Sequence, residues 1–262
     1  MKKAHVPGKG DGGGASAVSN VRLLGRRPHL SLPRLCLPMP KSEKLWRGFV
    51  WVFLWWIAVG PTGLLAGPFD DWAYRAKIGI NNAPGTETLT DFPLLVTLNA
   101  SNFDFAKAKA DGTDLRFTTP TGTPLSYEIE KWDPAGRTGA VWVKVPQIDL
   151  GSTAGYIQMY FGNPSASDGQ NVADVWSNGY VGVWHLGGTG TAVDSTGVHP
   201  GTINGSGVTT TAGLIGDARS FAGDGSRITA SGTALDMADN LTISYWMKGA
   251  AANQPGSYTR VI

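Results

Sequence analysis

Glu128 and Glu130 are the only closely paired glutamates in the sequence. On a β-strand their side chains share one face, with Cβ atoms about 7 Å apart at a rise of roughly 3.4 Å per residue. Retaining glycosidases hold two carboxyl groups about 5 Å apart across a cleft. Jelly-roll glucanases carry acids at alternate strand positions, but the third such position here is Trp132. We therefore interpret the pair as a solvated strand face opposite buried Tyr127 and Ile129.

His185 is the second candidate for acid–base or metal chemistry. It follows Trp184, and His199 lies fourteen positions later, which is not a metal-ligand spacing. No serine or cysteine nucleophile motif accompanies it. The pattern favours a packed or strand-edge histidine over a catalytic one.

Aromatic side chains are the remaining candidates for ligand contact. Tryptophan faces suit the C–H faces of sugar rings, but most of these residues lie within alternating segments, where core packing is the default interpretation. No GxGxxG follows a strand, and no Walker loop, CxxC or GxSxG is present, so nothing requires a cofactor. The sequence assigns no catalytic or metal residue, leaves the ligand-binding residues unknown, and favours a non-enzyme without excluding an enzyme. The candidate platforms are Trp142, Trp176, Trp184 and Trp246.

Composition predicts an all-β protein rich in turns. Charged residues make up 16% of the 262 residues, and there are 36 glycines and ten tryptophans. The net charge of +2 conceals an asymmetry, because from Gly67 onward there are 12 basic and 18 acidic side chains, a net charge of −6. This acidic balance disfavours nucleic acid and anionic membranes as partners.

The N-terminal part has the pattern of an export signal. Residues 1–38 are basic and rich in Gly, Pro and Ser, so we expect no regular structure there, and our hypothesis is that translation begins at Met39. Residues 39–67 combine basic residues with the uncharged run Phe49–Val59, which predicts a cleaved signal peptide. A membrane anchor is the alternative. Either way the basic flank directs the C-terminal part out of the cytoplasm, with membrane contact only through this segment. Cys36 precedes the run, so the exported part has no disulfide.

Residues 70–164 predict a small β-sandwich, followed by a polar linker at 165–175. Turn-forming Gly, Pro, Asn and Asp separate short alternating segments at roughly ten-residue spacing. Residues 103–109 are expected to form one or two helical turns. The expected strands are Tyr74–Ile80, Phe92–Leu98, Asp114–Thr118, Leu125–Trp132, Ala140–Val145 and Gly155–Phe161.

This segment resembles an uncharacterised domain of bacterial exported proteins, a family known only as a domain of unknown function. The matching blocks are YRAKIGINN, LTDFPLLVTL, DGTDLRFT, LSYEIEKW, VWVKVP and YFGNP. The resemblance implies an extracytoplasmic setting. Such domains often precede laminin-G-type modules and sometimes form the outer part of proteins with a TolQ/ExbB-type proton channel.

Residues 176–262 predict a second β module. Strands are expected at 181–184, Ala218–Phe221 and Leu241–Lys248, joined by glycine-rich loops. The ordered blocks VGVWHL, DSTG, GTING, TAGLIGDARSFAGDG and LTISYWMK resemble the first half of concanavalin A-like, laminin-G-type jelly rolls. Since about 87 residues fall short of the roughly 100 of a complete sandwich, we expect this module to be incomplete.

The resemblance also bears on Asp194 and Asp224. Laminin-G-type modules can hold calcium at the rim with Asp side chains and backbone carbonyls, and calcium prefers such oxygen ligands. Aspartate close to glycine is also ordinary turn chemistry, which we favour for both residues.

These observations predict an exported, non-catalytic binding or adhesion protein of the bacterial cell envelope or exterior, with a polysaccharide or cell-surface glycan as ligand. One alternative is an accessory region of a polysaccharide-degrading enzyme. The other is the extracytoplasmic head of a TolQ/ExbB-type proton-channel protein.

Overall fold

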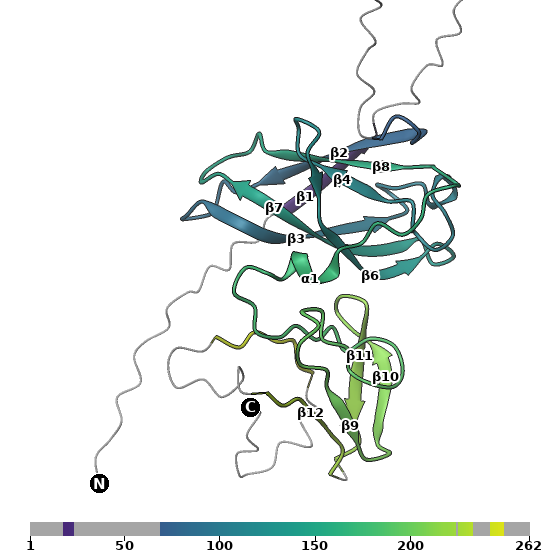
Figure 1. Cartoon of the computed structure of the whole chain (residues 1–262), viewed down its shortest axis with the longest axis vertical. Coiled ribbons are helices and arrows are strands. Elements are labelled where there is room, and N and C mark those ends of the chain that lie inside the picture. The colour runs from purple at the N-terminus through teal and green to yellow at the C-terminus, as the bar shows by residue number, and fades with distance from the viewer. Residues whose placement is uncertain (1–17, 24–68, 224, 233–241, 249–262) are drawn as a thin grey trace, which may run out of the picture.

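The computed structural model describes residues 18–23, 69–223, 225–232 and 242–248. In Figure 1 a two-sheet sandwich lies on one side of the short helix α1, and smaller sheets lie on the other side. The predicted all-β class is confirmed. The expected signal or anchor at 39–67 lies outside the described residues, as do Cys36 and Asp224. Within the described residues, no helix has the length and hydropathy needed to cross a membrane.

The first sheet of the sandwich has the strand order β1-β2-β8-β4-β5, with every neighbouring pair antiparallel. In strand β2 (Tyr74–Asn81) the odd-numbered residues face outward and the even-numbered residues face the core, as the alternation in YRAKIGIN predicts. The strands are β1 (Val18–Leu23), β2 (Tyr74–Asn81), β4 (Arg116–Thr118), β5 (Pro124–Leu125) and β8 (Tyr156–Phe161).

The second sheet has the order β3-β7-β6 and is also antiparallel. Its strands are β3 (Leu89–Asn99), β7 (Thr138–Ile148) and β6 (Tyr127–Asp133). The single expected strand Leu125–Trp132 is divided at Ser126, because Leu125 pairs with β4 of the first sheet and Tyr127 pairs with β7 of the second. The chain therefore changes sheets there. A short 3-10 turn, η1 (Phe105–Lys107), occupies the segment expected to be helical.

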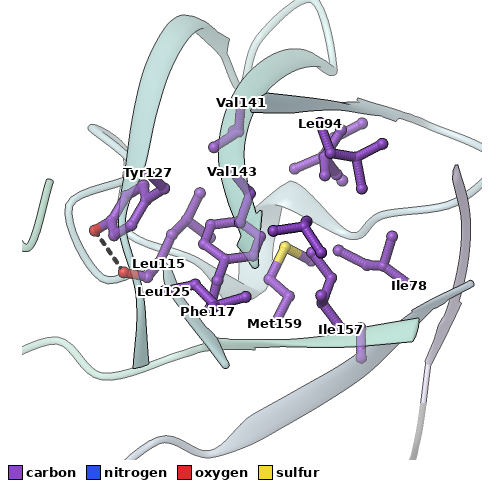
Figure 2. Close-up of a cluster of buried hydrophobic side chains, with 14 of the residues drawn as sticks. Ile78, Leu94, Leu115, Phe117, Leu125, Tyr127, Val141, Val143, Ile157 and Met159 are labelled. Carbon is purple, nitrogen blue, oxygen red and sulfur yellow. Dashed lines mark hydrogen bonds between the residues drawn. The ribbon is translucent and has the colours of Figure 1, made fainter. Parts of the chain in front are cut away.

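The core lies between these two sheets. Ile78 and Met159 of the first sheet and Leu94 and Val143 of the second are at most 1% exposed. Figure 2 shows these side chains meeting in one layer, with the Tyr127 hydroxyl donating a hydrogen bond to the Leu115 carbonyl at 2.7 Å. Each fully buried aliphatic side chain contributes about 1.5–3 kcal/mol, so this layer is the main source of stability.

Strand β1 corrects the expectation that residues 1–38 have no regular structure. Six residues of β1 pair antiparallel with β2, from Val18 opposite Asn81 to Leu23 opposite Ala76. Without them β2 would be an edge strand with free backbone donors and acceptors. Local composition gives no sign of this pairing, because the partner strand lies about fifty residues later in the chain.

The region after residue 164 contains the short helix α1 (Val172–Val175) and two small antiparallel sheets, β10-β11 and β12-β9. Strand β11 confirms the strand expected at Ala218–Phe221. The strand expected at 181–184 is wrong, because Val183 makes its backbone hydrogen bonds with a loop, to Ser195 and to the Asp194 carboxylate. The four strands are β9 (Thr202–Asn204), β10 (Val208–Ala212), β11 (Asp217–Phe221) and β12 (Arg227–Thr229).

Residues 242–248, the described part of the strand expected at Leu241–Lys248, have no strand structure, and every one of them is exposed. A strand needs a neighbour that accepts and donates its backbone hydrogen bonds. No pairing with another described strand is present for this segment.

Candidate functional site

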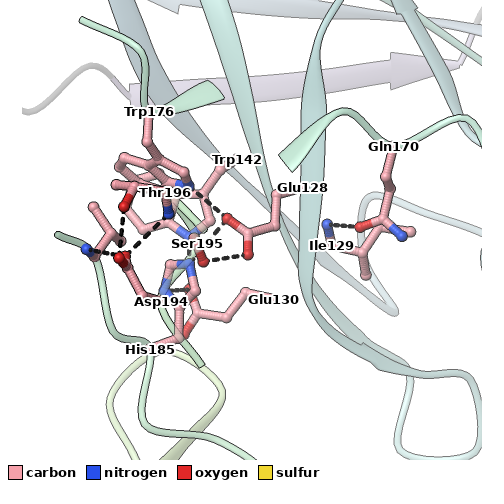
Figure 3. Close-up of polar contacts among 11 residues, drawn as sticks. Glu128, Ile129, Glu130, Trp142, Gln170, Trp176, His185, Asp194, Ser195 and Thr196 are labelled. Atoms are coloured by element: carbon pink, nitrogen blue, oxygen red, sulfur yellow. Dashed lines mark hydrogen bonds and ion pairs between the residues drawn. The ribbon is translucent and has the colours of Figure 1, made fainter. Parts of the chain in front are cut away.

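Six side chains from distant parts of the chain converge where the sandwich meets the later region. Strand β6 supplies two glutamates and β7 supplies the tryptophan directly opposite Glu128 in register. Trp176, the C-cap of α1, and the loop residues His185 and Ser195 complete the group, as Figure 3 shows. We call this group the Glu128–His185 cluster; it consists of Glu128, Glu130, Trp142, Trp176, His185 and Ser195.

Glu128 is the most heavily bonded member of the cluster. Its carboxylate accepts from Trp176 Nε1 at 2.6 Å and from Ser195 Oγ at 2.7 Å, and it lies 3.0 Å from His185 Nε2. Its side chain is 11% exposed. Burial by itself would raise the pKa of Glu128, but the hydrogen bonds and charge from His185, with the bonds from Ser195 and Trp176, outweigh burial and lower it. Glu128 is therefore an anion at neutral pH.

Glu130 lies two residues after Glu128 on β6 and faces the same side, at a β-bulge between Ile129 and Lys131. The amide of Ile129 donates a hydrogen bond to the side-chain oxygen of Gln170 in the linker at 2.6 Å. The Glu130 carboxylate accepts from Trp142 Nε1 at 2.6 Å and lies 3.2 Å from His185 Nδ1. Its side chain is only 6% exposed.

His185 links the two carboxylates through both of its ring nitrogens. An ionised carboxylate only accepts hydrogen bonds, so each ring nitrogen must carry a proton and the ring is an imidazolium. Burial would lower the pKa of His185, but the hydrogen bonds and charges of Glu128 and Glu130 raise it to about 9. The ring also stacks on Trp142, with an interplanar angle of 21° and centroids 6.1 Å apart.

The backbone beside His185 has an uncommon conformation. Leu186, the next residue, has a φ of 61°, in the left-handed region that residues other than glycine rarely adopt. Such a conformation costs on the order of 1 kcal/mol or more.

The geometry corrects the interpretation of the glutamate pair. The shared strand face is confirmed, but the solvated environment is wrong, because the later region covers the pair. A glycosidase acid needs a raised carboxyl pKa and a cleft between its two carboxylates. Here the pKa of Glu128 is lowered, and the imidazolium of His185 bonds to both groups. The packed histidine predicted from the sequence is confirmed.

Asp194 organises the loop that follows. Its carboxylate accepts from the amides of Val183 at 2.8 Å and His199 at 2.7 Å. Thr196 donates from its amide at 3.0 Å and its hydroxyl at 2.6 Å, and Val198 donates at 3.3 Å. Although burial opposes it, these donors lower the pKa of Asp194.

Both oxygens of Asp194 are therefore occupied by donors, which agrees with the turn interpretation and leaves no lone pair directed at calcium. Across the described parts of the chain, no three His, Cys, Asp or Glu side chains are grouped as a metal site would need. Asp224, the other calcium candidate, lies outside the described residues.

The four candidate sugar-stacking tryptophans have different environments. Trp142 and Trp176 belong to the cluster, and Trp184 donates from Nε1 to the His199 carbonyl at 2.9 Å. Trp246 is 80% exposed, so core packing is wrong for this residue. The sequence pattern does not indicate Ser195 as a member of the cluster. Its place in the DSTG turn gives no local sign that its hydroxyl reaches Glu128, 67 positions away.

Residues 111–183 match the family model of a domain of unknown function (DUF2341). The matched region contains Glu128, Glu130, Trp142 and Trp176, and it ends two residues before His185. The expected domain of unknown function is thus supported over these residues, while the concanavalin A-like resemblance of the later region stays a prediction. No curated protein and no solved structure matches the chain.

Proposed function

We propose that the protein is an exported, non-catalytic binding or adhesion protein that binds a glycan through its later, lectin-like region. The observation that carries this proposal is the exposure of two consecutive aromatic side chains. Trp246 is 80% exposed and Tyr245 is 57% exposed. Large exposed aromatic groups of this kind mark binding surfaces on soluble proteins.

The chemistry of these residues suits sugars. An indole face packs on the C–H face of a pyranose ring, and a tyrosine combines an apolar ring with a hydroxyl that donates and accepts hydrogen bonds. Ile243 and Met247, in the same segment, are 56% and 66% exposed and extend the apolar surface. The acidic balance from Gly67 onward argues for a neutral or basic ligand over an anionic one.

The involvement of the acidic pair in the cluster supports a non-catalytic role. Glu128 and Glu130 are the residues best suited by type and spacing to hydrolyse a glycosidic bond, and both are bonded to His185. An extracytoplasmic location follows from the signal or anchor predicted at residues 39–67. A fusion of residues 39–70 to a reporter that is active only outside the cytoplasm tests that location; an inactive reporter would contradict it.

A glycan array tests the proposed ligand class. The full chain, with and without calcium, should retain a defined set of glycans, and Trp246→Ala should weaken that binding by about tenfold or more, since about 1.4 kcal/mol corresponds to tenfold in affinity. Leu214→Ala is the matched control, because Leu214 is 71% exposed but lies outside the aromatic segment. Absence of glycan binding by the wild type, or equal binding by Trp246→Ala, would refute the proposal.

A further inference from the structure

The cluster has the composition of a receptor for an organic cation. Two carboxylates and two indoles surround one positive ring, and Tyr180 packs edge-on against Trp176 with centroids 5.1 Å apart. Trp142 and Trp176 lie 5.2 Å apart and both contact the His185 ring. Aromatic faces and carboxylates are the groups that proteins use to hold quaternary ammonium and guanidinium ions.

The receptor and its occupant come from separate parts of the chain. The sandwich and α1 position the walls, because Glu128 and Trp142 are paired on β6 and β7, and the Lys144–Asp174 ion pair at 3.2 Å joins α1 to β7. The occupant, His185, lies in the loop beyond α1, after Gly179, whose φ is 76°. The strands and the helix that carry the walls are therefore held together by contacts that do not involve His185.

Charge makes a cation necessary at this position. Glu128 and Glu130 have side chains that are 11% and 6% exposed, and their other donors, Trp142, Trp176 and Ser195, are neutral. Two neighbouring buried carboxylates without a counterion are strongly unfavourable. The nearby cations are engaged elsewhere: Lys131 pairs with Asp217, and Lys144 with Asp174.

We infer that the sandwich carries a binding site for one planar organic cation, formed by Glu128, Glu130, Trp142 and Trp176, and that His185 occupies this site in cis. The ligand class follows from the geometry of the occupant. The cation must be flat, because the His185 ring lies within 21° of parallel to Trp142. It must also donate from two separate positions, because the carboxylates of Glu128 and Glu130 lie 3.0 and 3.2 Å from Nε2 and Nδ1 of the ring. Imidazolium and guanidinium meet both requirements. This site is separate from the exposed aromatic segment at 242–248.

Chemical rescue of a variant without the occupant tests this inference. His185→Gly removes the ring and leaves the four wall residues unchanged. At about pH 6, where imidazole is largely protonated, added imidazole should bind saturably, change the tryptophan fluorescence and raise the thermal unfolding midpoint of the full-length variant. Wild type should show none of these responses, because His185 already fills the site. Pyrazole, a neutral ring of the same shape, should bind at least tenfold more weakly than imidazole.

Two further variants separate this inference from general cavity filling. His185→Gly/Glu128→Gln and His185→Gly/Glu130→Gln keep the cavity but each remove one negative charge, and each should weaken imidazole binding by about tenfold or more. Should His185→Gly fail to fold alone, imidazole but not pyrazole should restore the folded protein in refolding trials. The inference is overturned if imidazole has no effect on His185→Gly, or if pyrazole or the Glu→Gln variants match the response of His185→Gly to imidazole.

Discussion

The His185 interaction predicts a specific loss of stability at alkaline pH. The pKa of His185 is about 9 in the folded protein against an ordinary value of 6.5. Because the folded-state pKa is raised, the stabilisation is complete below pH 6.5 and is lost as the pH rises towards 9. Each unit of pKa difference corresponds to about 1.4 kcal/mol, so the loss is about 3 kcal/mol. The His185 side chain is 18% exposed, so solvent screens this interaction only partly.

Acid weakens the same interaction from the other side. The pKa of Glu128 is lowered, so its contribution is present above its ordinary value of 4.5 and is lost as the pH falls through the folded-state value. The two shifts describe one interaction, and their energies must not be added. The cluster therefore stabilises the protein most between about pH 4.5 and 6.5.

Urea unfolding of wild type and His185→Gln, followed by tryptophan fluorescence at several pH values, measures the effect. The difference in unfolding free energy between the two proteins should decrease by about 3 kcal/mol between about pH 6 and 10. Proton NMR gives an independent measurement, because the His185 ring resonance should titrate near pH 9. Glu130→Gln is the control, and it should move that midpoint down towards 6.5 by removing one carboxylate. A wild-type-to-variant difference that is constant with pH would refute the reasoning.

Three other substitutions test the structure elsewhere. Glu128→Ala leaves the donors of the cluster unpaired and should lower the free energy of unfolding by about 3 kcal/mol, measured by urea unfolding near pH 6; a loss under about 1 kcal/mol would show that the cluster is not buried. Asp194→Ala removes the acceptor for five donors and should cost about 2 kcal/mol or more, with faster amide exchange at 183 and 199 as the diagnostic, whereas unchanged exchange would contradict the loop geometry. Gly162→Ala should lower the thermal midpoint more than Gly151→Ala does. Both glycines have positive φ, but a Cβ at Gly162 would lie 2.5 Å from Tyr74 whereas none lies within 4 Å at Gly151; equal effects would mean that the Tyr74 ring moves aside.

In the sandwich, the local sequence pattern predicts where individual strands begin and end. Strands β2 and β8 lie within one residue of their expected bounds, because alternating apolar side chains and Gly, Pro, Asn and Asp turns act over a few residues. The same pattern predicts a strand at 181–184, but no strand forms there, because these strand-forming residues have no neighbouring strand. Propensity describes which residues suit a pleated sheet, but pairing requires a partner that the local pattern does not identify.

The glutamate pair marks the same limit for the site. Period-two spacing correctly placed Glu128 and Glu130 on one face of β6, since that follows from backbone geometry alone. It could not show that His185, 57 positions after Glu128, lies against that face and makes it a buried ionic cluster.

The sequence by itself determined the all-β class, the alternation that forms the sandwich core, and the common face of the two glutamates, because each depends on neighbours within a few residues. Only the tertiary structure decided that this face is buried, that His185 is an imidazolium between two carboxylates, and that Trp246 is exposed. These properties depend on which distant segments lie together, since burial and charge pairing set the energies and the pKa values.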